Sequence, residues 1–244
     1  MTQIQSGRLE RLVRMVGQEG LDKLSGATVA VFGLGGVGGS CVEALARGGV
    51  GTLILVDGDE VQESNINRQA IAFYSTIGRR KVDVMRAMVA DIAPETRVIT
   101  HDAFILPDDD IMPFLDPRPD YVIDAVDTVG TKLALAQAAE RIGASFVGSM
   151  GAANKRFPEM LAFADIHKTS MCPLCKAVRK QARKLGIQRM RVLYSREAPA
   201  QVKAAEGSQH GERTELGTLS YMPPIMGQML AGDVLRSILG MEGA

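Results

Sequence analysis

The chain has 244 residues, and its 28 lysine and arginine residues are balanced by 28 aspartate and glutamate residues. This length suffices for a sizeable buried core, and the zero net charge gives no global attraction to nucleic acids or membranes. Any basic binding surface must therefore be local. Because the chain has three cysteines and no charged-then-apolar leader, a secreted disulfide framework is disfavoured and a cytoplasmic protein is expected. No transmembrane helix is expected either, since Asp233 and Arg236 interrupt the longest apolar stretch.

The first 25 residues have a helical pattern. From residue 28 to about residue 151, short β-branched runs alternate with longer helical patterns. Such alternation predicts an α/β fold that is Rossmann-like and doubly wound, with a mostly parallel sheet and helices on both faces. The expected strands cover residues 28–32, 52–57, 97–100, 121–125 and 145–148. Two intervening helices have clear apolar stripes, and they end before Pro94 and at Gly143.

After residue 151 the pattern is less regular. A strand is expected at 160–164, a basic segment at 176–191, a polar loop at 204–215 and a closing helix at 225–239. No internal repeat or low-complexity tract marks a second domain. We therefore expect a single domain over residues 1–244.

A glycine loop, VFGLGGVGGS, follows the first expected strand. Its Gly33, Gly35 and Gly38 permit a tight turn from strand to helix, close approach of the backbone to a phosphate, and a helix N-terminus aimed at negative charge. Asp57, at the end of the next strand, is placed to accept hydrogen bonds from ribose hydroxyls. These features alone leave open a dinucleotide, another nucleotide or no ligand.

The stretch DGDEVQESNINRQ favours a triphosphate. ATP needs cations and amide donors near its β- and γ-phosphates, and Arg68, Asn65 and Asn67 follow Asp59 here. Further along, Lys81 supplies a second positive charge, and Asp127 ends the DAVDT strand where it can hold Mg²⁺. Each residue can also be interpreted without a ligand, as a turn residue, a member of a surface ion pair, a helix start or a helix cap. Their combination around one glycine loop favours a nucleotide site.

In order and spacing, GLGGVG, DGDEVQESNINRQ, GRRKV and DAVDT resemble the nucleotide-site motifs of the ubiquitin-activating-type adenylating enzymes, whose bacterial members include ThiF and MoeB. The resemblance implies ATP and Mg²⁺ as cofactors. It implies that Asp57 binds ribose, that Asn67, Arg68 and Lys81 bind phosphates, and that Asp127 binds the metal. The full set of expected nucleotide-binding residues is Gly33, Gly35, Gly36, Gly38, Asp57, Asp59, Asn65, Asn67, Arg68, Lys81 and Asp127.

The same resemblance implies a homodimer. Members of the family have an N-terminal arginine that reaches the partner's ATP, and RLVRMVG places Arg11 at the matching position, with Arg14 the weaker candidate. Arg11, Arg68, Lys81 and Asp127 are thus the expected catalytic residues. It also implies three parts: a helical segment at 1–25, a nucleotide-binding core at 26–151, and a substrate-side and dimer-side part at 152–244.

The cysteines bear on the branch of the family. ThiF and MoeB usually have two CxxC pairs that bind zinc, but Cys172 and Cys175 form a single pair here, which cannot close a tetrahedral site. That pair has three open interpretations: no special role, redox sensitivity or metal bridging between subunits, and transient thiol chemistry. Cys41 is expected to be a small buried residue in the helix after the glycine loop.

The later segments resemble the tRNA threonylcarbamoyladenosine dehydratase branch, the TcdA or CsdL group. The matching segments are GSMGAANK, DIHKTSMCPLCKAVRK, RVLYSREAP and GTLSYMPPIMGQMLAGDVLRSILG. The resemblance implies that ATP activates the carboxylate of threonylcarbamoyladenosine in tRNA, after which the group cyclises with net loss of water. It implies tRNA as a partner and allows a sulfur-relay protein as another.

The basic segment bears on tRNA binding independently. It contains no acidic residue, in an otherwise neutral protein, and local positive charge of this kind suits a phosphate backbone. An apolar stripe in the same segment also fits an ordinary solvated helix face. The candidates for tRNA contact are Lys176, Arg179, Lys180, Arg183 and Lys184, with Arg189 and Arg191 in the same stretch.

Three functions are therefore considered. The first is an ATP-dependent tRNA dehydratase, and the second is an enzyme that adenylates the C-terminus of a ubiquitin-like sulfur carrier. The third is a dinucleotide-binding oxidoreductase or redox module. The absence of a second CxxC pair weighs against the second function, and Arg68, Lys81 and Asp127 weigh against the third.

Overall fold

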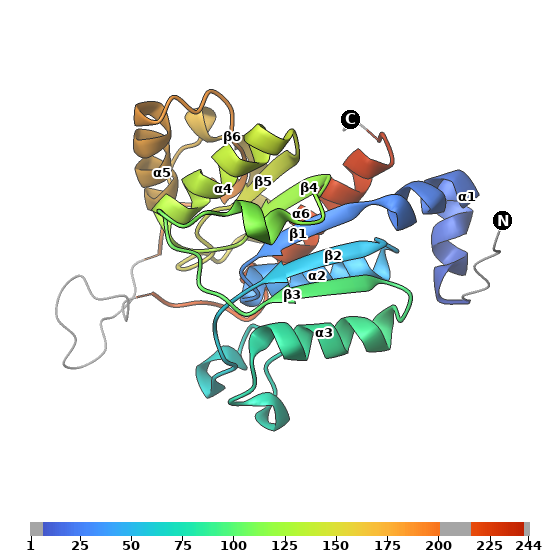
Figure 1. Cartoon of the computed structure of the whole chain (residues 1–244). Coiled ribbons are helices and arrows are strands. Elements are labelled where there is room, and N and C mark those ends of the chain that lie inside the picture. The colour runs from blue at the N-terminus through green and yellow to red at the C-terminus, as the bar shows by residue number, and fades with distance from the viewer. Residues whose placement is uncertain (1–6, 201–215, 242–244) are drawn as a thin grey trace.

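The computed structural model describes residues 7–200 and 216–241. Within these residues seven strands form a single sheet in the order β3-β2-β1-β4-β5-β7-β6 (Figure 1). The strands are β1 (Thr28–Phe32), β2 (Thr52–Val56), β3 (Arg97–His101), β4 (Tyr121–Asp124), β5 (Ser145–Ser149), β6 (Leu161–Asp165) and β7 (Arg191–Ser195). The β6–β7 pair is antiparallel, and the other neighbouring strands are parallel. The strand order reverses direction between β1 and β4, and ligands of open α/β sheets bind at the carboxyl edge of such a point.

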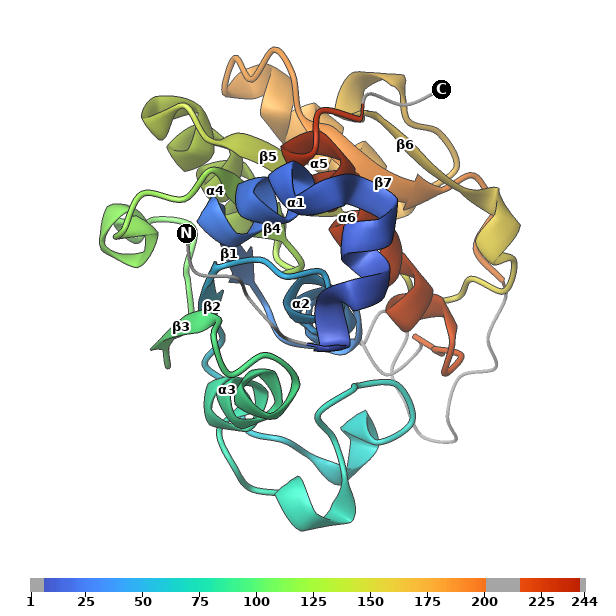
Figure 2. The same ribbon diagram turned by 90° about the vertical axis from the view of Figure 1, so that its right-hand side faces the viewer.

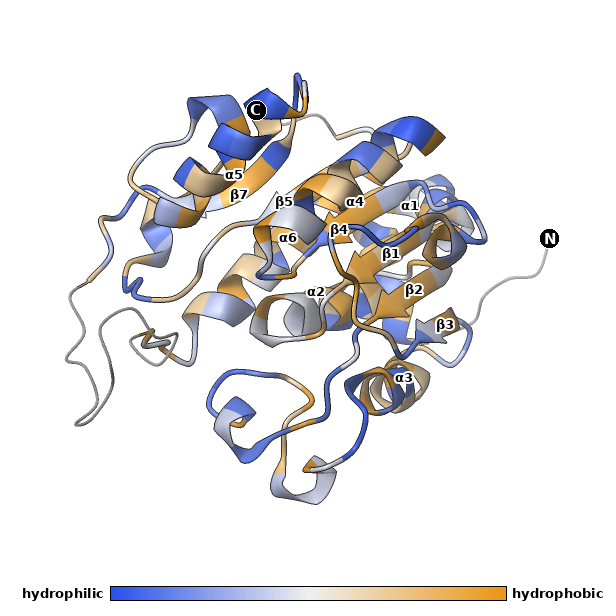
Figure 3. Cartoon of the chain, turned by 60° about the vertical axis from the view of Figure 1, so that its left-hand side comes forward, coloured by the Kyte–Doolittle hydropathy of each residue, from blue (hydrophilic) through white to orange (hydrophobic). Residues whose placement is uncertain are grey.

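Helices cover both faces of the sheet because side chains alternate along each strand. Val29 and Val31 of β1 point into one core, with α2 (Gly36–Arg47), α3 (Lys81–Ile92) and α6 (Met222–Ile238). Ala30 and Phe32 point into the opposite core, which contains α4 (Val129–Ile142). Next to it, α5 (Pro173–Lys184) packs with α4 on β7. The views in Figures 2 and 3 show these layers, with the apolar strands enclosed between helices.

The predicted α/β fold is confirmed, and the first five expected strands end within one residue of their predicted limits. The strand expected at 160–164 is β6, shifted by one residue at each end. The prediction is incomplete at β7, since residue 191 falls in the expected basic segment and no strand is expected there. The closing helix begins at Met222 rather than at residue 225, because prolines at its first turn need no hydrogen-bonded amide.

The N-terminal segment is helical but not continuous. Helix α1 (Glu10–Gly26) is interrupted at Gly17, whose φ of 71° is left-handed. The expected segment 1–25 and the expected loop 204–215 lie partly or wholly outside the described residues. In the part that is described, no helix combines the length and apolarity needed to span a bilayer.

Asn154 joins the two described ends that flank residues 201–215. Its backbone N–H donates to the carbonyl of Gly217 at 2.8 Å, and its Oδ1 accepts from the N–H of Gly217 at 2.8 Å. Its carbonyl accepts from the N–H of Ala200 at 2.9 Å. Asn154 has a left-handed φ of 57°, a conformation that asparagine tolerates better than most residues. Ala200 and Gly217, on the two sides of this segment, are therefore both bound to Asn154.

Candidate active site

The glycine loop forms a very tight turn between β1 and α2. Gly33 has a φ of 87°, and a Cβ atom there would lie 2.8 Å from the carbonyl oxygen of Ala125 at the end of β4. A Cβ on Gly38 would lie 1.8 Å from the carbonyl oxygen of Gly33, so only glycine fits. The first turn of α2 is thereby held against the ends of β1 and β4. Its unpaired amides and positive dipole end create a place for a phosphate.

Asp57 follows β2 and braces this turn. Its Oδ2 accepts from the N–H of Leu34 at 2.6 Å, and its Oδ1 accepts from the N–H of Asp59 at 2.8 Å. Burial raises the pKa of Asp57, while the positive charge of Lys81 and the two amides oppose that rise. Because a carboxylate accepts more than two hydrogen bonds, Asp57 can still bind a ribose hydroxyl while it holds the turn.

Lys81 and Asp59 form an ion pair at the rim of the same cavity. The Lys81 ammonium lies 2.8 Å from Oδ2 of Asp59, and the Lys81 side chain is only 6 % exposed. Lys81 is the first residue of α3, and its backbone N–H donates to the carbonyl of Asp59 at 3.0 Å. The pair fixes the ammonium between β2 and α3, and an incoming phosphate can compete with Asp59 for it.

Arg68 is positioned by its own loop. Its guanidinium donates to the carbonyl of Ser64 at 3.0 Å and to Oδ1 of Asn67 at 2.8 Å. Asn67 is exposed, and its amide donates to the carbonyl of Thr218 at 3.2 Å, so it joins the loop to the segment before α6. Asn65 is buried and caps a short turn by accepting from the N–H of Gln62 at 3.1 Å.

These residues surround a cavity of about 560 Å³ at the carboxyl edge of β1, β2 and β4. Nine of the eleven expected nucleotide-binding residues line it: Gly33, Gly35, Gly36, Asp57, Asp59, Asn65, Arg68, Lys81 and Asp127. Asp127 comes three residues after β4 ends. Two expected residues do not: Gly38 lies beneath the turn, and the Asn67 side chain is bonded to Arg68 and Thr218. The cavity therefore combines a helix N-terminus, two cations and several carboxylates.

A buried ion pair supports the β4 end of the cavity. The Lys132 ammonium lies 3.1 Å from both oxygens of Asp124 and 2.7 Å from the carbonyl oxygen of Ser149, and both side chains are fully buried. Burial raises the pKa of Asp124, and Lys132 opposes that rise. Removing either partner of a buried ion pair destabilises the fold, because the other charge is left buried and unpaired. The pair therefore joins α4, β4 and β5 at Asp124, three residues before Asp127.

Sequence reasoning missed several residues that line the cavity. Gln69 is nearly buried, and its Oε1 has no hydrogen-bond partner among the described residues, so a ligand donor would satisfy it. It belongs to the quoted motif ending in NRQ and could have been included. Phe104 is 67 % exposed beside the cavity and presents an apolar face suited to a base. Nothing in its local sequence indicates that position.

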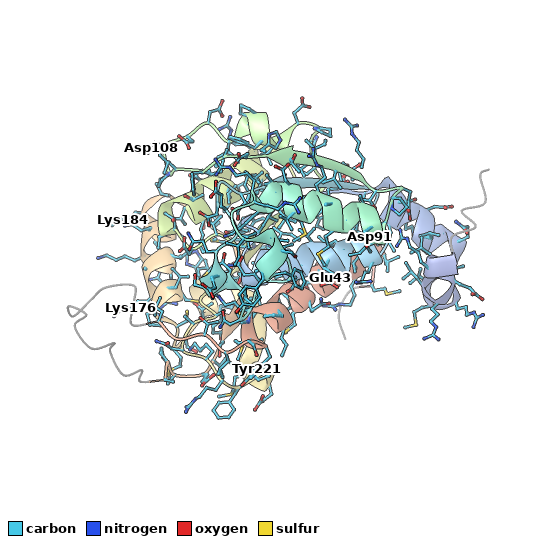
Figure 4. All side chains as sticks on the ribbon, turned by 90° about the horizontal axis from the view of Figure 1, so that it is seen from below. Glu43, Asp91, Asp108, Lys176, Lys184 and Tyr221 are labelled. Atoms are coloured by element: carbon cyan, nitrogen blue, oxygen red, sulfur yellow. The ribbon has the colours of Figure 1, made fainter. Side chains whose placement is uncertain are left out.

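Other expected residues lie elsewhere on the molecule. Arg11 is exposed on α1, which precedes the first strand and lies at the amino edge of the sheet, opposite the cavity (Figure 1). Arg14 is bound to Glu10. The five basic candidates are on α5, and Figure 4 shows Lys176 and Lys184 at the outer side of the molecule. No group of three metal-binding side chains occurs in residues 7–200 and 216–241.

A second cavity, of about 450 Å³, lies between β5 and α6. It is lined by three charged residues that pair with one another, since Asp233 lies 2.7 Å from Arg191 and 3.4 Å from Arg236. It has no helix N-terminus of the kind found at the glycine loop. The first cavity is therefore the better candidate for an active site.

Comparison with known proteins adds an independent line of evidence. The model of the ThiF family matches residues 8–244. A tRNA threonylcarbamoyladenosine dehydratase of Bacillus subtilis (strain 168) is 39% identical over 233 residues, which cover 92% of this chain and 91% of that protein. The adenylyltransferase and sulfurtransferase uba4 of Aspergillus niger is 32% identical over 140 residues, which cover 57% of this chain and 29% of that protein.

The fold is also similar to a solved dehydratase. The crystal structure of TcdA, the tRNA N6-threonylcarbamoyladenosine dehydratase of E. coli, in complex with ATP has a TM-score of 0.86 with this chain. The two are 28% identical in sequence, and the match covers 96% of this chain and 94% of that one. The similarity includes the C-terminal strands and helices as well as the glycine loop.

The first prediction concerns the two cations of the cavity. Arg68→Ala and Lys81→Ala should each weaken ATP binding about ten- to a hundredfold, because each removes a charge-assisted contact worth about 1.5 to 3 kcal/mol. Titration calorimetry with ATP measures the loss. Arg86→Ala is the matched control, since Arg86 lies on the exposed face of α3 and pairs with Asp83 at 3.1 Å. Unchanged ATP affinity in both cavity variants would exclude these phosphate contacts.

Proposed function

The chain belongs to the ThiF family, and we propose that it is an ATP-dependent tRNA threonylcarbamoyladenosine dehydratase. The observation that carries this proposal is that the chain matches dehydratases over nearly their whole length. The B. subtilis enzyme matches across 91% of its own sequence, and the ATP-bound E. coli structure matches across 94% of its chain. The cavity of this chain provides the groups that a nucleoside triphosphate needs, at the carboxyl edge of the sheet.

The sulfur-carrier alternative has weaker support. The match to uba4 is confined to 57% of this chain and to 29% of the longer protein. The single CxxC pair does not close a zinc site of the kind expected for that branch. A dinucleotide oxidoreductase does not account for Arg68, Lys81 and Asp127 around the same cavity. The dehydratase therefore remains the better interpretation.

The reaction has two chemical steps. The threonylcarbamoyl carboxylate attacks the α-phosphorus of ATP, forms an acyl adenylate and releases pyrophosphate. A nucleophilic atom of the same modified group then attacks the acyl carbon, closes the ring and expels AMP, so that the substrate has lost one water. In this scheme Lys81, Arg68 and the amides at the start of α2 balance charge that develops on the phosphates. Asp57 holds the ribose and the turn together.

The residues present also fit a magnesium ion. Mg²⁺ is usually held by one or two carboxylates together with substrate phosphates, and Asp127 provides a carboxylate beside the cavity. Asp127 would hold the ion, which would supply positive charge near the pyrophosphate. Because tRNA is the substrate, we also expect the protein to act in the cytoplasm.

The decisive experiment for the reaction uses purified protein, ATP and tRNA that contains threonylcarbamoyladenosine. We expect the modified nucleoside to lose about 18 Da, the mass of one water, with formation of AMP and pyrophosphate, as mass spectrometry of nucleoside digests can show. Unmodified tRNA and a protein ending in Gly-Gly serve as the two controls. ATP turnover with the Gly-Gly protein, and none with the modified tRNA, would favour sulfur-carrier adenylation instead.

We further propose that the enzyme acts as a homodimer in which Arg11 enters the partner's cavity. Arg11 is exposed and lies at the opposite edge of the sheet from its own cavity, so any contact with ATP must come from a second subunit. Arg14 is already bound to Glu10, and Arg8 is bound to Glu95. Arg11 is therefore the best placed of these three arginines to act between subunits.

This arrangement predicts complementation between inactive variants. Arg11→Ala and Asp127→Asn homodimers should each lose activity, because each lacks one group at both sites. Mixed in equal amounts, they should regain about one quarter of wild-type activity, since half of the dimers are mixed and each has one intact site. Native mass spectrometry verifies subunit exchange, and Arg14→Ala is the control for the same helix. If exchange occurs without recovery, Arg11 does not act across subunits.

For tRNA, we propose that the exposed face of α5 contacts the phosphate backbone. No acidic side chain in the described residues forms an ion pair with Lys176, Lys180, Arg183 or Lys184. Arg179 is less available, because it donates to the carbonyl and hydroxyl of Thr169 at 2.9 and 2.7 Å. Arg191 is not part of this face, since it lies in β7 and pairs with Asp233.

Charge reversal tests this face. The double variant Lys180→Glu and Arg183→Glu should raise the KM for tRNA and leave ATP affinity unchanged. Its tRNA binding should also depend less on salt, with a log–log slope that is smaller by about one for each phosphate that the protein no longer neutralises. Arg86→Glu with Arg97→Glu is the matched control, because both residues are exposed and far from α5 in sequence. An equal rise in KM for the control pair would show that only net charge matters.

A further inference from the structure

The CPLC motif at the start of α5 has no role in the adenylation site described above. Cys172 is the N-cap residue of the helix, Pro173 is the first helical residue, and Cys175 is the third. A side chain at the N-cap lies over the amide of the third helical residue, so the two sulfur atoms are on the same side of the first turn. Both cysteines are in the reduced form here.

The surroundings of the two thiols differ in a way that suits a reactive pair. Cys172 is 5 % exposed, whereas Cys175 is fully buried in the core between α4, α5 and β7. Hydrogen bonding with the Cys175 thiol lowers the pKa of Cys172 to about 5 against the effect of burial, and amides of Cys175, Gly151 and Leu174 add to the lowering. The same contact with Cys172, together with burial, raises the pKa of Cys175.

Cys41 shows that burial alone does not produce this difference. It is fully buried within α2, and burial raises the pKa of its thiol. It has neither a helix N-terminus nor a second cysteine beside it. The protein thus contains one buried cysteine with no cysteine beside it and one pair in which the pKa of the first thiol is lowered and the pKa of the second is raised.

We propose that Cys172 and Cys175 form a redox-active dithiol pair that a hydroperoxide converts to a disulfide. The Cys172 thiolate attacks the O–O bond of hydrogen peroxide, forms an S–O bond and releases hydroxide, which is protonated to water. The Cys175 sulfur then attacks the sulfenic sulfur; the S–S bond forms, the S–O bond breaks, and the Cys175 proton leaves with the oxygen as a second water. The two thiols lose two electrons and the peroxide gains them. A dithiol reductant reverses the change by thiol–disulfide exchange.

The small exposed fraction of Cys172 limits which oxidants can reach it. Hydrogen peroxide is small enough to enter at the exposed first turn of α5, beside Met171, which is 64 % exposed. A bulky disulfide such as oxidised glutathione needs more room around the attacking sulfur. The pair should therefore respond to small peroxides much faster than to bulky disulfides. This proposal does not depend on the reaction proposed for the ATP cavity.

The test treats the full-length, reduced protein with hydrogen peroxide, then denatures it and alkylates the remaining thiols. Before alkylation we expect the wild-type protein to have lost about 2 Da, and after alkylation we expect one added group, on Cys41, with Cys172 and Cys175 joined. Loss of the Cys172 thiol should be at least about tenfold faster than loss of Cys41. Cys175→Ser should instead accumulate a sulfenic acid on Cys172 that dimedone labels, whereas Cys172→Ser should give neither product. Circular dichroism verifies that both variants are folded.

Three results would overturn the proposal. The first is alkylation of all three cysteines at equal rates after peroxide. The second is a disulfide between two chains in place of the internal one. The third is about one tightly bound zinc per two chains in the purified protein, which would make the pair half of a metal site shared by two subunits.

Discussion

The active site depends on the close contact between the glycine turn and the end of β4. Gly33 and Gly38 leave no room for a Cβ atom, and the carbonyl of Ala125 fills the space beside Gly33. This contact places the N-terminus of α2 over the point where the strand order reverses. It also brings Asp127, two residues after Ala125, to the cavity that the turn borders. A side chain at either glycine would separate the amides at the start of α2 from the residues that follow β4.

Buried charge maintains that geometry at some thermodynamic cost. Lys132 and Asp124 are fully buried, so their charges are stable only because they face each other and the carbonyl of Ser149. Asp57 is partly buried, and it accepts two amides of the turns on which the nucleotide would lie. Asp124 and Asp57 thus both help to fix the backbone next to the cavity. The site is therefore held rigid before any ligand binds, which reduces the conformational cost of binding.

Much of this arrangement could be predicted from the sequence because it follows from local patterns. Buried parallel strands read as β-branched runs, and five of them were located within one residue of each end. By contrast, β7 was not predicted, because its first residue lies in the basic segment, although the turn at Gly186 precedes it. The position of Phe104 could not be predicted, since it depends on how the loop after β3 folds back over Gly58.

The site residues, too, could be predicted only in part. The motif located Arg68, Lys81, Asp59 and Asp127 around one cavity, because residues that end neighbouring parallel strands meet at one edge. A motif does not give the direction of a side chain, and Asn67 was expected to face the phosphates. Its amide instead donates to the carbonyl of Thr218, because its loop turns that side chain toward the segment before α6.

That hydrogen bond connects the two halves of the protein. The residues that line the candidate site all lie within residues 32–131, whereas β5, β7 and β6 continue the sheet beyond β4 and carry α5 at its outer side. Asn67 binds Thr218, and Asn154 binds both Ala200 and Gly217. The chain on both sides of residues 201–215 is therefore fixed relative to the ATP cavity. Because the net charge is zero, the contact with tRNA that we propose for α5 depends on local charge, and the packing of α5 with α4 and β7 sets the position of that charge in the fold.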